Sequence, residues 1–207
     1  MLRFLKLAAI TAIAATGALS CLAVAATQPP PNYMPASAAA SFEHAPAIVE
    51  GASGAQVKST IYVFMDPNCI FCHYTWEALQ PYEAAGLQVH WIPMGFLKPD
   101  SAGKAAALLQ AANGPALLHE LETKFSEEKE SGGIAPLAKV PAATKAKLDG
   151  NAKLFTSLGF DGTPAIIYKT GDGRWASLDG LPHLSALPGI LNLPEQPITN
   201  PSLARFR

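Results

Sequence analysis

The 207-residue sequence has few cysteines and almost no net charge, and each shortage excludes a class of protein. Three Cys are too few for the dense disulfide scaffold of a small secreted domain. A formal charge of −1 argues against a nucleic-acid-binding protein that depends on phosphate contacts. The hydrophobic share of 49% argues against a disordered chain. A folded domain with a sizeable core is therefore expected.

The first 25 residues differ from the rest of the chain. A basic start, an apolar run over 7–18 and small residues at 23–25 form the pattern of a cleaved secretory signal peptide, assigned here to 1–25. Gly17 and Ser20 interrupt the run before it reaches the roughly 20 apolar residues of a membrane-spanning helix, so cleavage is preferred over an anchor. Lipid attachment at Cys21 is a minor alternative.

Cleavage would leave one Cys pair, Cys69 and Cys72, in an oxidising compartment. The segment 26–58, which follows the signal peptide, is rich in Pro and Ala and has few periodic apolar positions. It is predicted to be an extended linker or a loosely docked arm, with Phe42 and the apolar pair at 48–49 as candidate anchors to the body.

Residues 59–207 alternate strand and helix patterns typical of an α/β domain. The patterns predict strands over 61–65, 87–91, 165–168 and 174–178, and helices over 69–84, from Ser101, from Pro115, over 142–158 and over 184–191. This order predicts a parallel first unit and an antiparallel closing hairpin. The three middle helices form an insertion at about 97–158.

The segment Cys69-Ile70-Phe71-Cys72 lies where a buried strand leads into a helix. Amide groups of the first helical turn and the helix dipole stabilise an anion there, so the pKa of Cys69 is expected below the free value of about 8.5. Cys72 lies one turn deeper on the apolar stripe, placed to attack a mixed disulfide at Cys69. Cys69 is the predicted nucleophile, Cys72 the resolving residue, and Cys69–Cys72 the redox disulfide.

His73 follows in the same turn, where the helix dipole disfavours a second positive charge, so it is expected to be mostly neutral and to assist only. Cys69-x-x-Cys72-His73 also matches the attachment motif of c-type haem, and a haem protein stays open as an alternative. A zinc site would need two more ligands, and a structural disulfide across four residues would stabilise little. No metal or cofactor is otherwise expected.

The segment 64–73 resembles the active-site segment of the DsbC/DsbG family of periplasmic thiol:disulfide interchange proteins. Gly162-Thr163-Pro164-Ala165-Ile166 resembles the Thr/cis-Pro loop of that family. Further segments are similar to DsbG in particular, at 95–99, 132–133, 151–159 and 180–182. The match covers about 59–193 and implies a periplasmic protein with a thioredoxin fold.

The resemblance also implies roles for the residues around the Cys pair. Pro164 is expected to be cis and to face the cysteines, and Thr163 to pair with the extended backbone of a substrate. Ile70 and Phe71 are expected to contact the same substrate. The implied partners are proteins with disulfides or oxidised cysteines, and a membrane thiol reductase as electron donor.

Two features depart from the family pattern. Its members carry a dimerisation domain before the catalytic domain, and only 26–58 remain for one here, so a monomer is expected. The dipeptide Ile70-Phe71 differs from the small or Pro-containing pairs of the family, and this dipeptide helps to set the redox poise. The leading hypothesis is a DsbG-like thiol-disulfide oxidoreductase, with a DsbA-like oxidase or a non-catalytic thioredoxin-fold binding module as alternatives.

Overall fold

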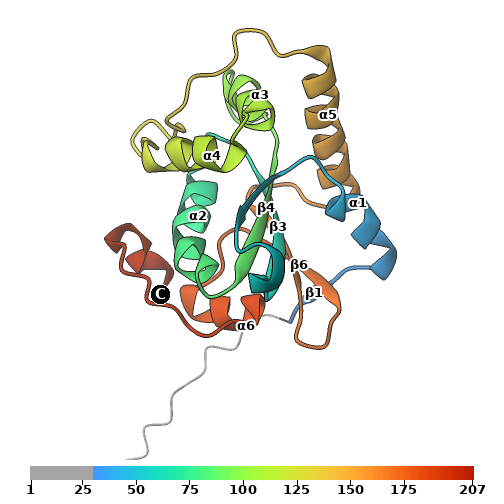
Figure 1. The fold of residues 1–207 in the computed structure, drawn as a ribbon, viewed down its shortest axis with the longest axis vertical. Helices are drawn as coiled ribbons and strands as arrows, with labels where there is room; N and C mark the ends of the chain where they lie inside the picture. The colour runs from blue at the N-terminus through green and yellow to red at the C-terminus, as the bar shows by residue number, and fades with distance from the viewer. Residues whose placement is uncertain (1–29) are drawn as a thin grey trace, which may run out of the picture.

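A six-stranded sheet forms the centre of the protein (Figure 1). The computed structural model describes residues 30–207, so the predicted signal peptide and Cys21 lie outside the described residues. The strands are β1 (Asn32–Tyr33), β2 (Ile48–Gly51), β3 (Ser59–Met65), β4 (Leu87–Pro93), β5 (Ala165–Lys169) and β6 (Trp175–Asp179). Their spatial order is β1-β6-β5-β3-β4-β2.

Helices connect and cover these strands. The α-helices are α1 (Ala39–Glu43), α2 (Ile70–Glu83), α3 (Ser101–Gln110), α4 (Gly114–Thr123), α5 (Ala142–Ser157) and α6 (Leu187–Leu191). Four short 3₁₀ helices are η1 (Ala36–Ala38), η2 (Gly54–Gln56), η3 (Leu184–Ala186) and η4 (Pro201–Phe206). Within residues 30–207, no helix is long and apolar enough to cross a membrane.

The pairing of the strands confirms the predicted α/β architecture. β3 and β4 are parallel and are joined through α2, whereas β5 and β6 form an antiparallel hairpin beside β3. The helices α3, α4 and α5 lie between β4 and β5 in the chain, as the predicted insertion requires.

The central strand β3 is buried on both faces, which explains its unbroken apolar run. Ile61, Val63 and Met65 face the core under α2 and α6, and Tyr62 and Phe64 face the opposite core beside α5. Figure 1 shows α2, α4 and α6 on one side of the sheet, and α1 and α5 on the other. Cys69 follows this strand directly, so the packing of β3 fixes where the Cys pair begins.

Of the two alternatives predicted for 26–58, an extended linker is wrong for the part that the structure describes, which docks on the body as an arm. β2 pairs antiparallel with β4, and β1 pairs with β6, so this segment adds a strand at each edge of the sheet. The Phe42 side chain is 1% exposed, and its ring centroid lies 5.0 Å from those of Tyr62 and Trp175. Elements of two to five residues are too short to show a period in the sequence, which is why composition alone suggested a linker.

Candidate active site

Cys69 caps the N-terminus of α2, directly after the turn that ends β3. Its Sγ accepts a hydrogen bond from the backbone N–H of Cys72 at 3.2 Å. The Cys69 thiol also lies 3.3 Å from the carbonyl oxygen of Thr163, to which it donates. The sulfur therefore lies between the first turn of α2 and the loop that precedes β5.

Both cysteines are free thiols, and both are buried. The pKa of Cys69 is lowered, first by the hydrogen bond with the Cys72 side chain and then, against the effect of burial, by the backbone amides of the helix turn. Burial raises the pKa of Cys72 well above its usual value, and the neighbouring Cys69 sulfur adds to this. The two thiols therefore differ in the direction that a nucleophile and a resolving residue require.

The loop at 162–164 brings a second chain segment to Cys69. The Thr163–Pro164 peptide bond is cis, as the family resemblance implied. β5 pairs antiparallel with β3, so the residues that precede β5 lie beside the end of β3 where the Cys segment begins. The buried Oγ1 of Thr163 has no hydrogen-bond partner among the described residues.

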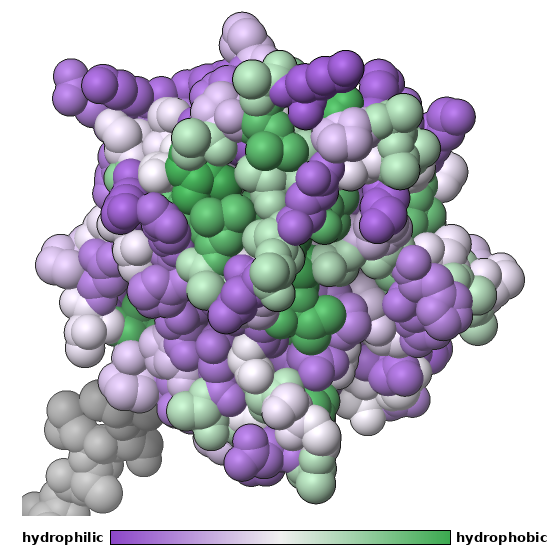
Figure 2. Space-filling view, turned by 45° about the horizontal axis from the view of Figure 1, so that its top comes forward, coloured by the Kyte–Doolittle hydropathy of each residue, from purple (hydrophilic) through white to green (hydrophobic). Residues whose placement is uncertain are grey.

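Exposed apolar side chains surround this end of the sheet. Phe71 is 50% exposed, and in the loop after β4 Phe96 and Leu97 are 51% and 46% exposed. Ile70 is partly buried against the core. Figure 2 looks onto the upper end of Figure 1 and shows hydrophobic residues gathered near the middle of that face, among polar ones. In the sequence, the segment 95–99 was noted only for its similarity to DsbG, and no role was predicted for Phe96 or Leu97.

The loop that carries Phe96 and Leu97 is fixed by the buried Asp66 carboxylate. Oδ2 of Asp66 accepts hydrogen bonds from the backbone N–H groups of Phe96 and Leu97 at 2.8 and 3.1 Å. Oδ1 accepts from the Ser101 hydroxyl at 2.7 Å and from the Asn68 N–H at 2.9 Å. One side chain thus ties together the Cys turn, the β4–α3 loop and the start of α3.

Asn68 extends these connections to the insertion. Its Nδ2 donates to Asp100 Oδ1 at 2.9 Å, and its Oδ1 accepts from Lys104 Nζ at 2.8 Å. Lys104, 3% exposed, also lies 2.9 Å from Asp100 Oδ2 and donates to the Ser131 hydroxyl. Sequence reasoning missed this network, although polar residues directly after a buried strand were a signal for it.

His73 has a different environment from the one predicted. Its Nδ1 lies 2.9 Å from Oε2 of the buried Glu122, and its ring stacks on Phe125. Burial works to lower the pKa of His73, but Glu122, Glu77 and Glu127 outweigh it and raise that pKa. The sequence did not predict this partner: a carboxylate 49 positions along the chain opposes the unfavourable helix dipole and shifts His73 toward its protonated form.

The same geometry bears on the haem alternative. The ring nitrogens of His73 face Glu122 and Glu77, at 2.9 and 3.6 Å, and the residue is buried. An axial ligand to haem would have to leave this carboxylate environment. Within residues 30–207, no group of three or more His, Cys, Asp or Glu side chains is arranged to hold a metal ion.

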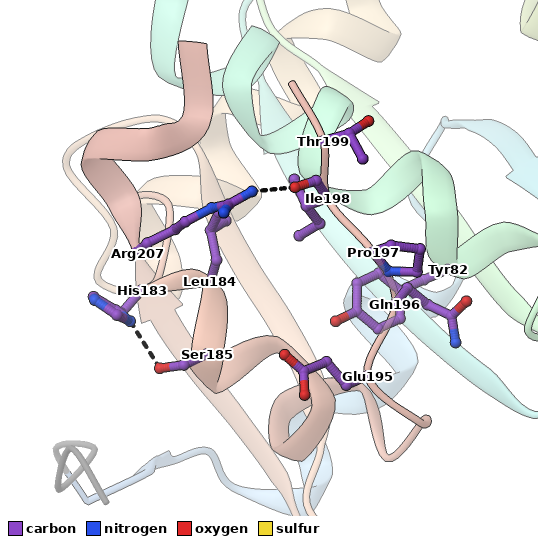
Figure 3. Close-up of a pocket in the computed structure, with 10 residues that line it drawn as sticks. All are labelled: Tyr82, His183, Leu184, Ser185, Glu195, Gln196, Pro197, Ile198, Thr199 and Arg207. Carbon is purple, nitrogen blue, oxygen red and sulfur yellow. Dashed lines mark hydrogen bonds between the residues drawn. The ribbon is translucent and has the colours of Figure 1, made fainter. Parts of the chain in front are cut away.

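A pocket of about 610 Å³ lies away from the Cys pair (Figure 3). It is lined by Tyr82, near the C-terminal end of α2, and by residues of the C-terminal segment. Figure 3 shows Arg207 reaching the carbonyl oxygen of Ile198, and His183 beside Ser185. Because α2 rises about 1.5 Å per residue, Tyr82 and Cys69 are on the order of 20 Å apart, and the pocket is separate from the thiol site.

Comparisons with known proteins agree with this arrangement. The chain is 37% identical over 138 residues to the thiol:disulfide interchange protein DsbG of Pseudomonas aeruginosa, covering 66% of this chain and 52% of the relative. It is 33% identical over 132 residues to DsbG of Escherichia coli, covering 61% and 50%. The chain thus spans about half the length of these curated relatives. No protein-family model matches it.

Solved structures share the fold at lower sequence identity. A periplasmic thioredoxin-like protein from Salmonella enterica has a TM-score of 0.57 at 19% identity, covering 77% of this chain and 96% of that one. ScsC of Proteus mirabilis in a compact conformation has a TM-score of 0.58 at 19% identity, covering 85% and 83%. The chain therefore has the thioredoxin fold, and over about two thirds of its length it is a sequence relative of the DsbG thiol:disulfide interchange proteins.

Proposed function

We propose that the protein is a periplasmic thiol:disulfide oxidoreductase that acts on disulfides or oxidised cysteines of other proteins. The observation that carries the proposal is the position of Cys69 Sγ. It accepts from the Cys72 N–H at the N-terminus of α2 and lies 3.3 Å from the Thr163 carbonyl oxygen. A sulfur in this position is both stabilised as an anion and adjacent to a segment that can bind a partner chain.

Reduction of a substrate disulfide takes place in two exchanges. The Cys69 thiolate attacks one substrate sulfur, the substrate S–S bond breaks, and the other substrate sulfur leaves as a thiolate that takes up a proton. Cys72 then loses its proton and attacks Cys69 in the mixed disulfide, which releases the second substrate thiolate. Two electrons pass to the substrate, and Cys69–Cys72 becomes the disulfide.

The raised pKa of Cys72 fits this order of events. Burial comes first among its causes, but the hydrogen bond with Cys69 and the charge of Cys69 also raise it. In the mixed disulfide Cys69 carries no charge, so the repulsion that opposes ionisation of Cys72 is removed. The Cys72 thiol therefore stays protonated until a substrate is bound to Cys69 as a mixed disulfide.

The surroundings of Cys69 suit an extended protein segment. Thr163 lies directly before β5, where strand-like pairing with a substrate backbone can occur beside the sulfur. The half-exposed Phe71, together with Ile70, offers apolar contact on the helix side, and cis-Pro164 borders the site on the loop side. These four residues are the proposed substrate-binding set.

Location and partners complete the proposal. The signal-peptide pattern at 1–25, the DsbG relatives and the similar periplasmic thioredoxin-like protein support export to the periplasm. A membrane thiol reductase would return electrons to Cys69–Cys72, and the protein would act as a monomer. Light scattering of the purified protein tests the last point, since a stable dimer would contradict it.

The decisive experiment is trapping of the mixed disulfide. Cys72→Ser cannot resolve it, so this variant is expected to form covalent adducts with periplasmic proteins that disappear on reduction, seen on non-reducing gels and identified by mass spectrometry. Cys69→Ser/Cys72→Ser, which lacks the nucleophile, is the matched control and should form none. Absence of adducts from Cys72→Ser would refute the proposal. If adducts form, the reduction potential of the natural protein against glutathione gives the direction of electron flow.

A further inference from the structure

The first turns of α2 pack against a fully buried carboxylate from the insertion. Glu122 lies on α4, is 2% exposed, and its Oε2 is 2.9 Å from His73 Nδ1. No other ring or ammonium group within residues 30–207 forms an ion pair with Glu122. A buried carboxylate is costly unless it is paired, so the contact with His73 determines the charge state of both groups.

His73 is held in place from three sides. Glu77 of α2 lies 3.6 Å from its Nε2, and Phe125, which follows α4, stacks on its ring with centroids 4.5 Å apart. Glu127 completes the acidic surroundings, although its carboxylate accepts from the Tyr74 hydroxyl at 2.7 Å. The facing titratable groups other than Tyr74 are all carboxylates, and they favour a protonated imidazole.

His73 is also one helical turn from the reactive sulfur. Its backbone N–H donates to the Cys69 carbonyl oxygen at 3.1 Å, so the two residues are stacked along α2 in an i, i+4 relation. We propose that Glu122 is a positioning residue for thiol exchange, which holds His73 as an imidazolium and thereby stabilises the Cys69 thiolate. This inference rests on the proposed function, because it concerns the reactivity of the same sulfur.

The location of the carboxylate gives the helical insertion a part in the chemistry. Glu122 contacts the His73 ring, and His73 follows Cys69 by one helical turn. Removing Glu122 leaves a buried imidazole with its strongest partner lost, and burial then favours the neutral ring. The thiolate loses a neighbouring positive charge, and Cys69 becomes less acidic.

The experiment is a thiolate titration of Glu122→Gln by absorbance at 240 nm, together with its reduction potential against glutathione. The pKa of Cys69 is expected to rise by about one unit. The potential is expected to become more negative by up to about 30 mV, the equivalent of that shift for a two-electron couple. Glu122→Asp, which keeps the charge, should restore part of both values.

A matched control is Glu120→Gln on the same helix, where the carboxylate is exposed and paired with Lys124. It should leave both readouts unchanged. An unchanged Cys69 titration in folded Glu122→Gln would overturn the inference. Covalent trapping by Cys72→Ser does not depend on Glu122. If Cys72→Ser, with Glu122 intact, forms no adducts, the result refutes the proposed function rather than the role of Glu122.

Glu122→Gln could fail to fold, and the natural sequence then supplies the test. The pKa of the His73 ring, followed by NMR, should lie above its ordinary value of 6.5 and should be lower in Cys69→Ser, because coupling between two sites is reciprocal. A ring that is neutral at pH 6, or a titration identical in the two proteins, would contradict the proposal.

Discussion

Cys69 and Cys72 are three residues apart and occupy opposite chemical environments. Cys69 accepts a helix N–H and lies beside a carbonyl oxygen, whereas Cys72 is 1% exposed in the core under α2. The pKa of the first thiol is lowered and that of the second is raised. Because the thiolate is the reactive form, this difference assigns the order of attack.

Differential alkylation tests this difference at the residue scale. Brief treatment of the reduced protein with iodoacetamide at pH 6.5 should modify Cys69 at least about tenfold faster than Cys72, since each unit of pKa changes the thiolate fraction about tenfold. Peptide mass spectrometry gives the two rates. In urea the alkylation rates of Cys69 and Cys72 should converge. Equal rates in the folded protein would contradict the prediction.

At the scale of elements, the helical insertion is joined to the Cys turn by buried polar contacts. Asp66 and Asn68 lie in the turn, and Ser101 and Lys104 lie on α3. The backbone of the insertion also approaches the Cys turn closely at Gly132. A side chain at this position would collide with the Pro67 carbonyl oxygen, so only Gly fits there. The insertion therefore supports the geometry of Cys69.

Lys104→Met tests the contribution of these contacts. Methionine fills a similar volume but removes the ammonium donor from Asn68 Oδ1, which keeps only the Gly132 N–H, and from the Ser131 hydroxyl, so a loss of about 1–3 kcal/mol in the free energy of unfolding is expected. Urea denaturation measures it. The control is Lys145→Met on α5, which breaks an exposed pair with Asp149 and should cost at most about 1 kcal/mol. Equal losses in the two variants would show that the network is not stabilising.

The arm before β3 shows what sequence patterns miss at this scale. Phe42 and the pair at 48–49 were identified as candidate anchors; Phe42 and Ile48 are buried, whereas Val49 is 43% exposed. Pairing of β2 with β4 could not be foreseen, because four residues carry no measurable alternation and their partner is set by tertiary contact. Glu50 illustrates the same limit, since its carboxylate accepts from the indole N–H groups of Trp76 and Trp91, which are distant in the chain.

For the whole molecule, buried carboxylates link stability to pH. Burial raises the pKa of Glu83 to about 7 from an ordinary value of 4.5. Between about pH 4.5 and 7 this carboxyl therefore binds more protons in the folded protein than in the unfolded chain. Glu83 thus makes the free energy of unfolding decrease as pH rises through that window.

Glu83→Gln isolates one such contribution. The variant does not need to ionise a half-buried carboxylate, so its stability relative to the natural sequence should increase as the pH is raised from 5 to 8. Urea midpoints measured at both pH values test this. His90, whose pKa is lowered by burial, has the opposite effect but is common to both proteins and cancels. Glu128→Gln, at an exposed position, is the control, and a difference that does not change with pH would contradict the prediction.

The sequence by itself determined the strand–helix order, the Cys pair at a helix N-terminus and the Thr163-Pro164 loop, because these follow from short-range periodicity and from local motifs. Only the tertiary structure decided the carboxylate partner of His73, the network around Asn68 and the place of the arm in the sheet. In each case the deciding partner lies tens of residues away. The energy of a buried polar group depends on which groups folding brings beside it, and no local pattern contains that information.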